Sequence, residues 1–308
     1  KMILITGCAG FIGSHLCELL LKQHKIVIGI DNINDYYSKS FKQNNLNVLK
    51  IYSNFTFIQD DILDTTIFEK YTFDVVYHMA SLAGVRYSIE QPKMYVKNNI
   101  EGFIHLLENC VKYNIKTIVY ASSSSVYGIN KKLPFSESDD INTCNSPYAA
   151  SKKCMEVFAN TYNRLYDINT IGLRFFTVYG PRGRPDMAIY KFLSKIDNDE
   201  SIDKYGDGTS MRDYTYVDDI VYGIYLSSKM TGDRVYNLGN SSPITLNELI
   251  KKCEKVVGKK AIINNLPNQK GDVPNTYADI SKGKDELGWE PKVGIDEGLK
   301  RTYEFMKN

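Results

Sequence analysis

The sequence predicts an α/β fold: a doubly wound parallel sheet followed by a smaller, mixed α/β lobe at the C-terminus. Three observations support this prediction. Short apolar runs alternate with helical patterns from Met2 to Phe176, which is typical of parallel strands covered by helices on both faces. A glycine-punctuated turn joins the first apolar run to the first helical pattern. After Gly180 the alternation gives way to short helices, turns and scattered strands.

The apolar runs mark the expected strands in chain order, and helical spacing marks the segments between them. The expected strands cover residues 2–5, 26–30, 55–58, 73–78, 117–120 and 170–176. The expected helices start at Phe11, cover about 94–112 and cover 148–166, the last with Pro147 suited to its first turn. The polar segment between Asp31 and Asn54 is expected to hold one helix.

The composition narrows the classes of protein and partner. The chain has 308 residues with a net charge of +2 and no basic block, which argues against nucleic acid as a partner. No apolar run approaches the roughly 18–20 residues that cross a bilayer. No signal-peptide pattern precedes the first strand, so we expect a cytoplasmic protein without a membrane partner. Six scattered cysteines and four histidines without ligand spacing predict free thiols and no metal.

The turn after the first strand reads TGCAGFIG, with glycines at Gly7, Gly10 and Gly13. A strand that enters a helix through such a turn directs backbone N–H groups and the helix N-terminus at one point, which suits a diphosphate. Phe11 and Ile12 begin the helix and belong to the same expected site. The spacing is GxxGxxG rather than GxGxxG, so the turn predicts a dinucleotide only together with its surroundings.

The second strand supplies those surroundings, because its apolar run ends at Asp31 and Asn32. An acid at this point would accept hydrogen bonds from the adenosine ribose and repel a 2′-phosphate, which favours NAD over NADP. After the third strand, Asp61 could hold the adenine amino group while Ile62 packs against the adenine face. The sequence therefore predicts a Rossmann-type NAD-binding domain.

The fourth strand ends in small residues, including Ala80 and Ala83, that would let the backbone approach a flat cofactor. We expect residues 1–180 to form the NAD-binding domain, with 214–240 returning to it. Residues 181–308 are expected to form mainly the lobe that binds the other substrate.

Tyr148 and Lys152 form a YxxxK pair on one face of the expected helix. A phenol with a pKa of about 10 is a poor base at neutral pH. A neighbouring ammonium and a positive nicotinamide would favour the phenolate. The pair therefore predicts an acid–base tyrosine that takes a proton from an alcohol while hydride leaves for NAD.

Six motifs in order resemble the extended short-chain dehydrogenase/reductases that act on nucleotide-activated sugars. They are TGCAGFIG, SSSSVYG, YAASK, LRFFTVYGP, RDYTYVDDIV and NLGN, and the resemblance extends to about Trp289. It implies that Ser123 hydrogen-bonds the sugar 4-OH and that Lys152 orients the nicotinamide ribose. It also implies that Asn99 supports the site and that Arg212 pairs with the nucleotide diphosphate.

Two branches of this family compete. The 4,6-dehydratases carry an acid–base pair directly after the position that Ser123 occupies here, whereas this chain has Ser124 and Ser125 at those two positions. The segments AGVRYS and FFTVYGPRGRPDMA look most like UDP-glucuronate 4-epimerases. That resemblance implies that Thr177 and Arg184 recognise the sugar carboxylate.

The same resemblance places Arg86 and Asp272 in the UDP-sugar site. The helices expected over about 94–112 and 148–166 carry more apolar surface than one face can bury, so a second copy would cover the rest in a four-helix bundle, unless wider contact with the core does so. The resemblance also implies a homodimer.

The chain also departs from the family pattern. Thr177 stands where many UDP-hexose epimerases have Asn, and Gln269 stands where an arginine usually contacts phosphate, although Lys270 could replace it. Cys144 and Asn145 replace more usual residues upstream of the tyrosine, and a cysteine is a candidate acid–base group.

A UDP-sugar 4-epimerase is therefore the leading expectation, with UDP-glucuronate or UDP-N-acetylglucosamine as substrate. A 4,6-dehydratase acting on UDP-N-acetylglucosamine or UDP-glucose, with or without inversion at C5, stays open. A non-catalytic NAD-binding protein is a remote third.

Overall fold

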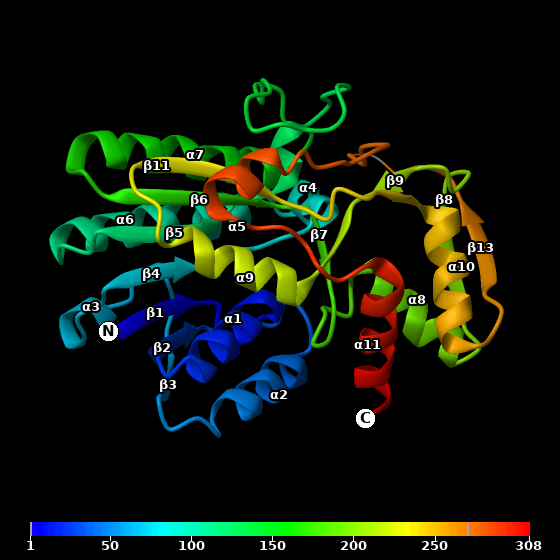
Figure 1. Ribbon diagram of the computed structural model, residues 1–308, viewed down its shortest axis with the longest axis horizontal. Coiled ribbons are helices and arrows are strands. Elements are labelled where there is room, and N and C mark those ends of the chain that lie inside the picture. The colour runs from blue at the N-terminus through cyan, green and yellow to red at the C-terminus, as the bar shows by residue number, and fades with distance from the viewer. Residues whose placement is uncertain (1, 270) are drawn as a thin grey trace.

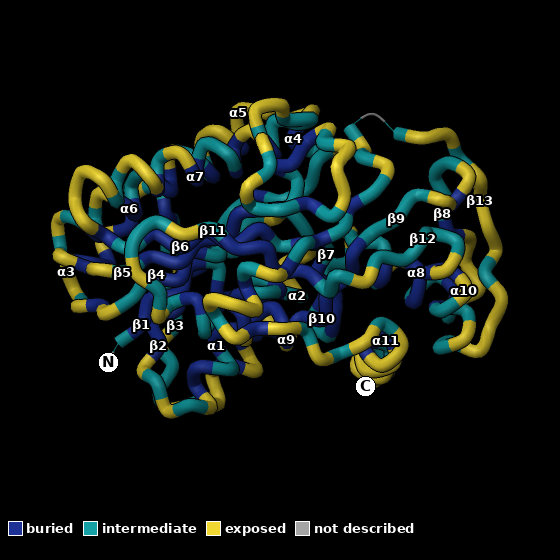
Figure 2. Tube along the Cα trace, turned by 45° about the horizontal axis from the view of Figure 1, so that its top comes forward, coloured by how far each residue is buried: buried dark blue, intermediate teal, exposed yellow. Residues whose placement is uncertain are grey.

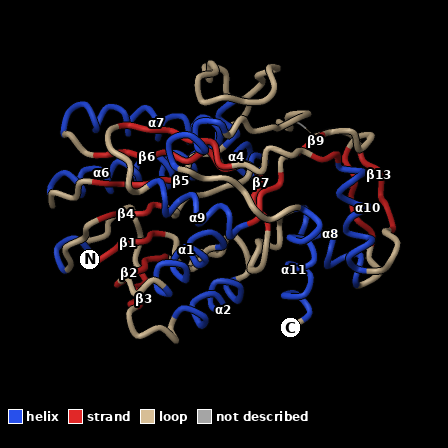
Figure 3. The backbone as a smooth tube through the Cα atoms, in the orientation of Figure 1, coloured by secondary structure: helices blue, strands red, loops and turns tan. Residues whose placement is uncertain are grey.

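A seven-stranded parallel sheet forms the centre of the structure, a computed structural model that describes residues 2–269 and 271–308 (Figure 1, Figure 3). The strand order is β11-β6-β5-β4-β1-β2-β3. The strands are β1 (Met2–Thr6), β2 (Ile26–Asp31), β3 (Phe55–Gln59), β4 (Val75–His78), β5 (Thr117–Ala121), β6 (Asn169–Phe175) and β11 (Asp233–Leu238). The expected fold class and all six expected strands are confirmed.

The order of the strands creates a crevice at one edge of the sheet. β1 pairs with β2 on one side and with β4 on the other, so the chain leaves β1 in opposite directions across the sheet. In open parallel sheets, ligands bind outside the carboxyl ends of the strands at such a reversal. The glycine turn follows β1, and the small residues Ala80 and Ser81 come shortly after β4, so both segments lie at this crevice.

Different helices cover the two faces of the sheet, and each face has its own apolar core. The core on one face includes side chains of α1 (Phe11–Lys22), α2 (Lys39–Leu49) and α9 (Val217–Ser227). The core on the other includes side chains of α3 (Ile67–Lys70), α6 (Gly102–Lys112) and α7 (Pro147–Tyr166). Figure 2 shows that the strands are mostly buried, while exposed residues lie along the outer sides of α6 and α7.

The helix expected over residues 94–112 is interrupted. Short helices α4 (Val85–Glu90) and α5 (Pro92–Tyr95) lead into a π-helical segment, Val96–Glu101, before α6 begins at Gly102. In the π-helical segment, Asn98 and Asn99 both accept a hydrogen bond from the backbone N–H of Leu82, at 3.2 and 2.8 Å. Two consecutive amides of this segment thus hold the loop after β4, and π-helical segments are frequent at functional sites.

The C-terminal part forms a smaller lobe with a core of its own. Its helices are α8 (Ala188–Asp197), α10 (Leu246–Val257) and α11 (Ile295–Lys307). Its strand pairs are β8 (Ser201–Tyr205) with β13 (Ile262–Leu266), β9 (Met211–Arg212) with β12 (Ile244–Thr245), and β7 (Thr177–Tyr179) with β10 (Tyr214–Tyr216). Two short helical turns, at Ser124–Tyr127 and Gly283–Leu287, complete the fold.

Because β11 joins the large sheet beside β6, the topology supports the proposal that residues 214–240 return to the cofactor domain. Within the described residues, the structure contains no helix with both the length and the apolar character that a membrane crossing requires.

Buried Asp213 ties the small lobe to the end of the large sheet. One carboxylate oxygen accepts from the N–H of Asn240, and the other accepts from those of Ser241 and Ala278, all at 3.0 Å. Three segments that are distant in the sequence therefore meet at one carboxylate.

We expect Asp213→Asn to lower the free energy of unfolding by about 3 kcal/mol, because its amide N–H₂ would face a backbone donor. Urea unfolding would measure the change. Asp199→Asn is the matched control in the same lobe, because Asp199 is exposed and pairs with Lys259 on the surface. It should cost no more than about 1 kcal/mol. An equal loss in the two variants would contradict a special role for Asp213.

Candidate active site

A cavity of about 500 Å³ lies at the carboxyl ends of β1, β2, β4, β5 and β6 and extends toward the small lobe. It brings together most of the residues that the sequence predicts. At its cofactor end these are Gly7, Gly10, Phe11, Ile12, Gly13, Asp31, Asn32, Ile62, Ala80 and Ala83. At its substrate end they are Ser123, Ser124, Ser125, Tyr148, Lys152, Thr177, Arg184, Arg212 and Asp272.

The glycine turn has a geometry that side chains would block. A Cβ on Gly13 would lie 2.0 Å from the carbonyl oxygen of Gly7, and Gly7 itself has a φ of +71°. A Cβ on Gly10 would meet only the Gly7 carbonyl oxygen, at 3.2 Å, so the space beyond it is open. Helix α1 begins at Phe11 without a side-chain cap, which leaves the N–H groups of its first turn for a ligand. The turn therefore fits a dinucleotide diphosphate.

Asp31 braces this turn from the end of β2. Its carboxylate accepts from the N–H of Ala9 at 3.2 Å and from that of Ile33 at 2.9 Å. Burial raises the pKa of Asp31, and the nearby Lys42 ammonium opposes that shift. Asn32 continues the edge of the cavity and donates to Asp61 at 2.9 Å.

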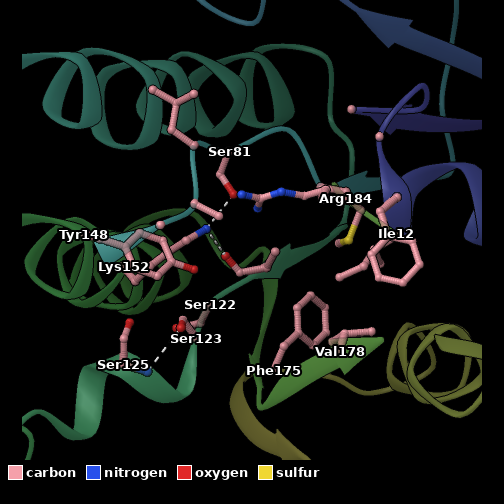
Figure 4. A pocket seen from close by; sticks show the side chains of 18 of the residues that line it. Ile12, Ser81, Ser122, Ser123, Ser125, Tyr148, Lys152, Phe175, Val178 and Arg184 are labelled. Atoms are coloured by element: carbon pink, nitrogen blue, oxygen red, sulfur yellow. Dashed lines mark hydrogen bonds between the residues drawn. The ribbon is translucent and has the colours of Figure 1, made fainter. Parts of the chain in front are cut away.

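Tyr148 and Lys152 lie on the first turns of α7, which begins where the sequence predicts. Ser146 caps the helix by accepting from the N–H of Ala149 at 3.1 Å. The Lys152 amine donates to the Ser81 hydroxyl at 2.6 Å and to the Ala121 carbonyl at 2.7 Å. It lies 5.9 Å from the centre of the Tyr148 ring, and Figure 4 shows both side chains facing the cavity.

The environment of the pair shifts both pKa values. Burial lowers the pKa of Lys152 from its ordinary value of 10.5 to about 7. Burial raises the pKa of Tyr148, and the Ser123 hydroxyl and the Arg184 guanidinium act in the opposite direction. The Ser123 hydroxyl therefore assists the deprotonation that a tyrosine base requires.

The serines after β5 present hydroxyl groups to the same space. Ser123 Oγ accepts from the N–H of Ser125 at 3.1 Å and so begins the short helical turn Ser124–Tyr127. Ser125 Oγ is buried and has no hydrogen-bond partner within the described part of the chain. A buried hydroxyl left without a partner in a cavity fits a polar ligand group at this point.

Arg184 brings a positive charge into the cavity from the segment after β7. Its Nε donates to Asp186 at 2.9 Å, its Nη2 donates to the second oxygen of the same carboxylate, and the guanidinium lies 5.3 Å from the centre of the Tyr36 ring. This pairing occupies one edge of the guanidinium. In Figure 4, Arg184 extends across the cavity toward Ser81.

Four predicted residues lie outside this cavity. Asn99 is buried behind it, where its amide donates to Leu82 and Ser151. Asp61 lines an adjoining cavity. Arg86 lies 3.6 Å from Asp272 and 4.8 Å from the Tyr205 ring, so it bridges the two lobes.

The fourth is the candidate acid–base residue. Cys144 does not belong to the described lining of the cavity, although Asn145 does, and burial raises the pKa of its thiol. Both findings weigh against a thiolate base. Lys270, the expected replacement for an arginine at Gln269, falls outside the described residues.

Sequence reasoning missed two residues of the site. Ser81 receives a hydrogen bond from the Lys152 amine, and Tyr36 forms a wall beside Arg184 while its hydroxyl donates to the Ala83 carbonyl at 2.8 Å. Ser81 is one of the small residues that follow β4, and that position was the sequence signal that could have identified it. Tyr36 lies in a polar segment without periodicity, and its position depends on how that segment folds.

Comparisons with known proteins agree with this geometry. Residues 4–302 match the family described as GDP-mannose 4,6 dehydratase. The UDP-glucuronate 4-epimerase of Thermodesulfobacterium geofontis is 46% identical over 309 residues, which cover 99% of this chain and 95% of that one. Protein CapI of Staphylococcus aureus is 46% identical over 328 residues, covering 98% of this chain and 97% of its own.

Among solved structures, the UDP-glucuronic acid 4-epimerase of Bacillus cereus, in complex with UDP-glucuronic acid and NAD, superimposes with a TM-score of 0.94. It is 38% identical, and the match covers 100% of this chain and 99% of that one. The chain belongs to the nucleotide-sugar epimerase/dehydratase family of the extended short-chain dehydrogenase/reductases.

Proposed function

We propose that this protein is an NAD-dependent 4-epimerase of UDP-sugars and that its substrate is UDP-glucuronate. The observation that carries the proposal is one cavity that combines the glycine turn, the Tyr148–Lys152 pair and the Arg184 cation. The relative named above as a UDP-glucuronate 4-epimerase, and the Bacillus cereus enzyme solved with UDP-glucuronic acid and NAD, support the same activity.

The residues at the substrate end divide the chemistry between them. Tyr148 takes the proton of the sugar 4-OH, and Ser123 hydrogen-bonds the same oxygen. Lys152 holds the cofactor ribose and, when charged, lowers the cost of the phenolate. Bound NAD supplies the acceptor for the C4 hydride and the donor that returns it. Inversion then requires that the 4-keto sugar turn over within the cavity before the hydride comes back.

The cavity favours epimerisation over dehydration. Removal of the C5 proton needs a base next to the sugar, and Ser124 and Ser125 offer only hydroxyl groups there. The carboxylates among the described lining residues are Asp31 and Asp60, at the ends of β2 and β3, and Asp272 of the segment facing Arg86. Cys144 does not supply the missing base, because it is not part of the described lining of the cavity and burial raises the pKa of its thiol.

The charge of Arg184 supports an acidic sugar. Its guanidinium is held by Asp186 along one edge and retains donors toward the cavity, where a carboxylate could accept from them. Thr177 and Arg212 line the same end, and we assign them to the sugar carboxylate and the diphosphate.

We also propose that the protein is a cytoplasmic homodimer. The outer side of the helical layer carries exposed apolar side chains at Val96, Val157 and Leu165, which a second copy would cover in a four-helix bundle. All six cysteines lie in described residues and are free, as in proteins of a reducing compartment.

Tyr148→Phe should abolish epimerisation, lowering kcat at least about 100-fold, because it removes the acid–base hydroxyl. Incubation with UDP-glucuronate in deuterated water, followed by proton NMR, would measure the product. Inversion at C4 without solvent deuterium is expected for the unchanged chain. Tyr166→Phe, an exposed tyrosine on the same helix, is the control and should keep full activity. Deuterium at C5 or a new C6 methyl signal would establish the dehydratase instead.

Arg184→Gln should weaken UDP-glucuronate selectively. Loss of a charge-assisted contact to the carboxylate is expected to raise its dissociation constant roughly 10- to 100-fold, with little change for neutral UDP-glucose. Calorimetric titration of both nucleotides against both proteins would test this. Equal losses for the two sugars would show that Arg184 does not read the carboxylate.

Burial of Lys152 should make stability depend on pH in the cofactor-free protein. Its pKa is about 7 in the folded state and 10.5 ordinarily, so between these values the unfolded chain binds more protons. The free energy of unfolding should therefore rise with pH over this window, by up to about 3 kcal/mol relative to Lys152→Met. Urea unfolding at several pH values would measure the difference between the two proteins. Parallel pH curves would contradict the expectation.

A further inference from the structure

A buried polar network lies directly beneath the serines after β5. Ser122 Oγ donates to Glu156 Oε1 at 2.7 Å. Arg174 donates to both oxygens of the same carboxylate, from Nε at 2.9 Å and from Nη2 at 2.8 Å. All three side chains are at least nine-tenths buried. An ion pair at this depth is costly to desolvate, and the hydrogen bond from Ser122 satisfies a further lone pair of its carboxylate.

The network reaches the other end of the same loop. The remaining Arg174 nitrogen, Nη1, donates to the hydroxyl of Tyr127 at 3.0 Å, and that hydroxyl donates to Asn237 of β11 at 2.6 Å. Ser122 and Tyr127 flank the segment that contains Ser123, Ser124 and Ser125. One ion pair therefore holds both ends of the segment that faces the cavity.

Helix α7 provides the second half of the geometry. Tyr148, Lys152 and Glu156 are spaced four residues apart and so lie along one face of the helix. Lys152 holds the carbonyl of Ala121, and one turn later Glu156 holds the hydroxyl of Ser122. Two successive turns of α7 thus grip the two residues that immediately precede Ser123.

We propose that Ser122 and Glu156 are positioning residues, whose hydrogen bond sets the Ser123 hydroxyl against Tyr148. The inference rests on the proposed function, because it assigns these two side chains to the same acid–base step. Neither side chain needs to touch the sugar. Their effect passes through the Ser123 hydroxyl, which opposes the effect of burial on the Tyr148 phenol.

The test uses the NAD-bound protein and the variant Ser122→Ala. Displacing a reacting group slightly is costly, so kcat for UDP-glucuronate should fall on the order of tenfold with KM unchanged. The titration midpoint of Tyr148 should move to higher pH, because the hydroxyl that favours the phenolate is no longer held in place. The midpoint is read from ¹³C-tyrosine NMR, as the signal that disappears in Tyr148→Phe. Ser122→Thr, which keeps the hydroxyl, should restore both values toward normal.

Ser227→Ala is the matched control. Ser227 is fully buried, and its hydroxyl donates to the Ile224 carbonyl at 2.8 Å in α9. Its loss should move neither kcat nor the midpoint. An unshifted midpoint in Ser122→Ala, or an equal loss of kcat in both alanine variants, would overturn the positioning role. If the unchanged chain did not convert UDP-glucuronate, the proposed function would be wrong, but that result would not decide the positioning role. A shifted midpoint in Ser122→Ala would still support the positioning.

Discussion

The amine of Lys152 is the contact on which the cavity depends. It joins Ser81 after β4 to Ala121 at the end of β5, and it does so from α7, which packs against the neighbouring strand β6. Removing an ammonium from water is unfavourable, and the lowered pKa of Lys152 records that cost. The surrounding structure must therefore be rigid enough to keep the amine in place. A bound dinucleotide would add polar partners where the protein alone leaves the amine poorly solvated.

Rigidity around this amine comes from two opposite sources. On one side, the π-helical segment holds the loop after β4 through Asn98 and Asn99, so Ser81 is kept within reach. On the other, the Glu156–Arg174 ion pair anchors the loop after β5. Both are internal hydrogen-bond systems rather than ligand contacts. The reacting groups thus sit between two preorganised supports, which is the arrangement that general acid–base catalysis favours.

The substrate end is organised by charge instead. Arg184 stacks on Tyr36 and is paired by Asp186, so its position in the cavity is set before any sugar arrives. Arg86 and Asp272 meet at the junction of the two lobes, where the NAD-binding domain and the small lobe face each other. The proposed recognition of an acidic sugar and the ion pair at the junction of the two lobes therefore involve different arginines.

Most of the site was predictable because its residues belong to local patterns. The glycine turn, the acid at the end of β2, the serines after β5 and the Tyr148–Lys152 pair each depend on spacing within one strand or helix. Residues whose roles depend on contacts between distant segments were not predictable in this way. Tyr36 and Asp186 meet Arg184 only when the loop after β2 folds against the segment after β7.

The limits of local reasoning also explain the remaining differences. Helical spacing over residues 94–112 could not reveal the π-helical segment, because that segment coincides with contacts to a loop sixteen residues earlier. Cys144 is near Tyr148 in sequence, yet among the described residues that line the cavity its place is taken by Asn145.

The sequence by itself determined the strand segments, the glycine turn and the acid–base pair, because period and spacing are local properties of a chain. Only the tertiary structure decided which N–H groups the turn keeps for itself. Those of Gly7 and Gly10 bond to the carbonyls of Ile30 and Gly7, so a diphosphate is left with the first turn of α1. It also decided that Ser122 and Glu156 meet, because a hydrogen bond between a strand end and a helix depends on how the two pack.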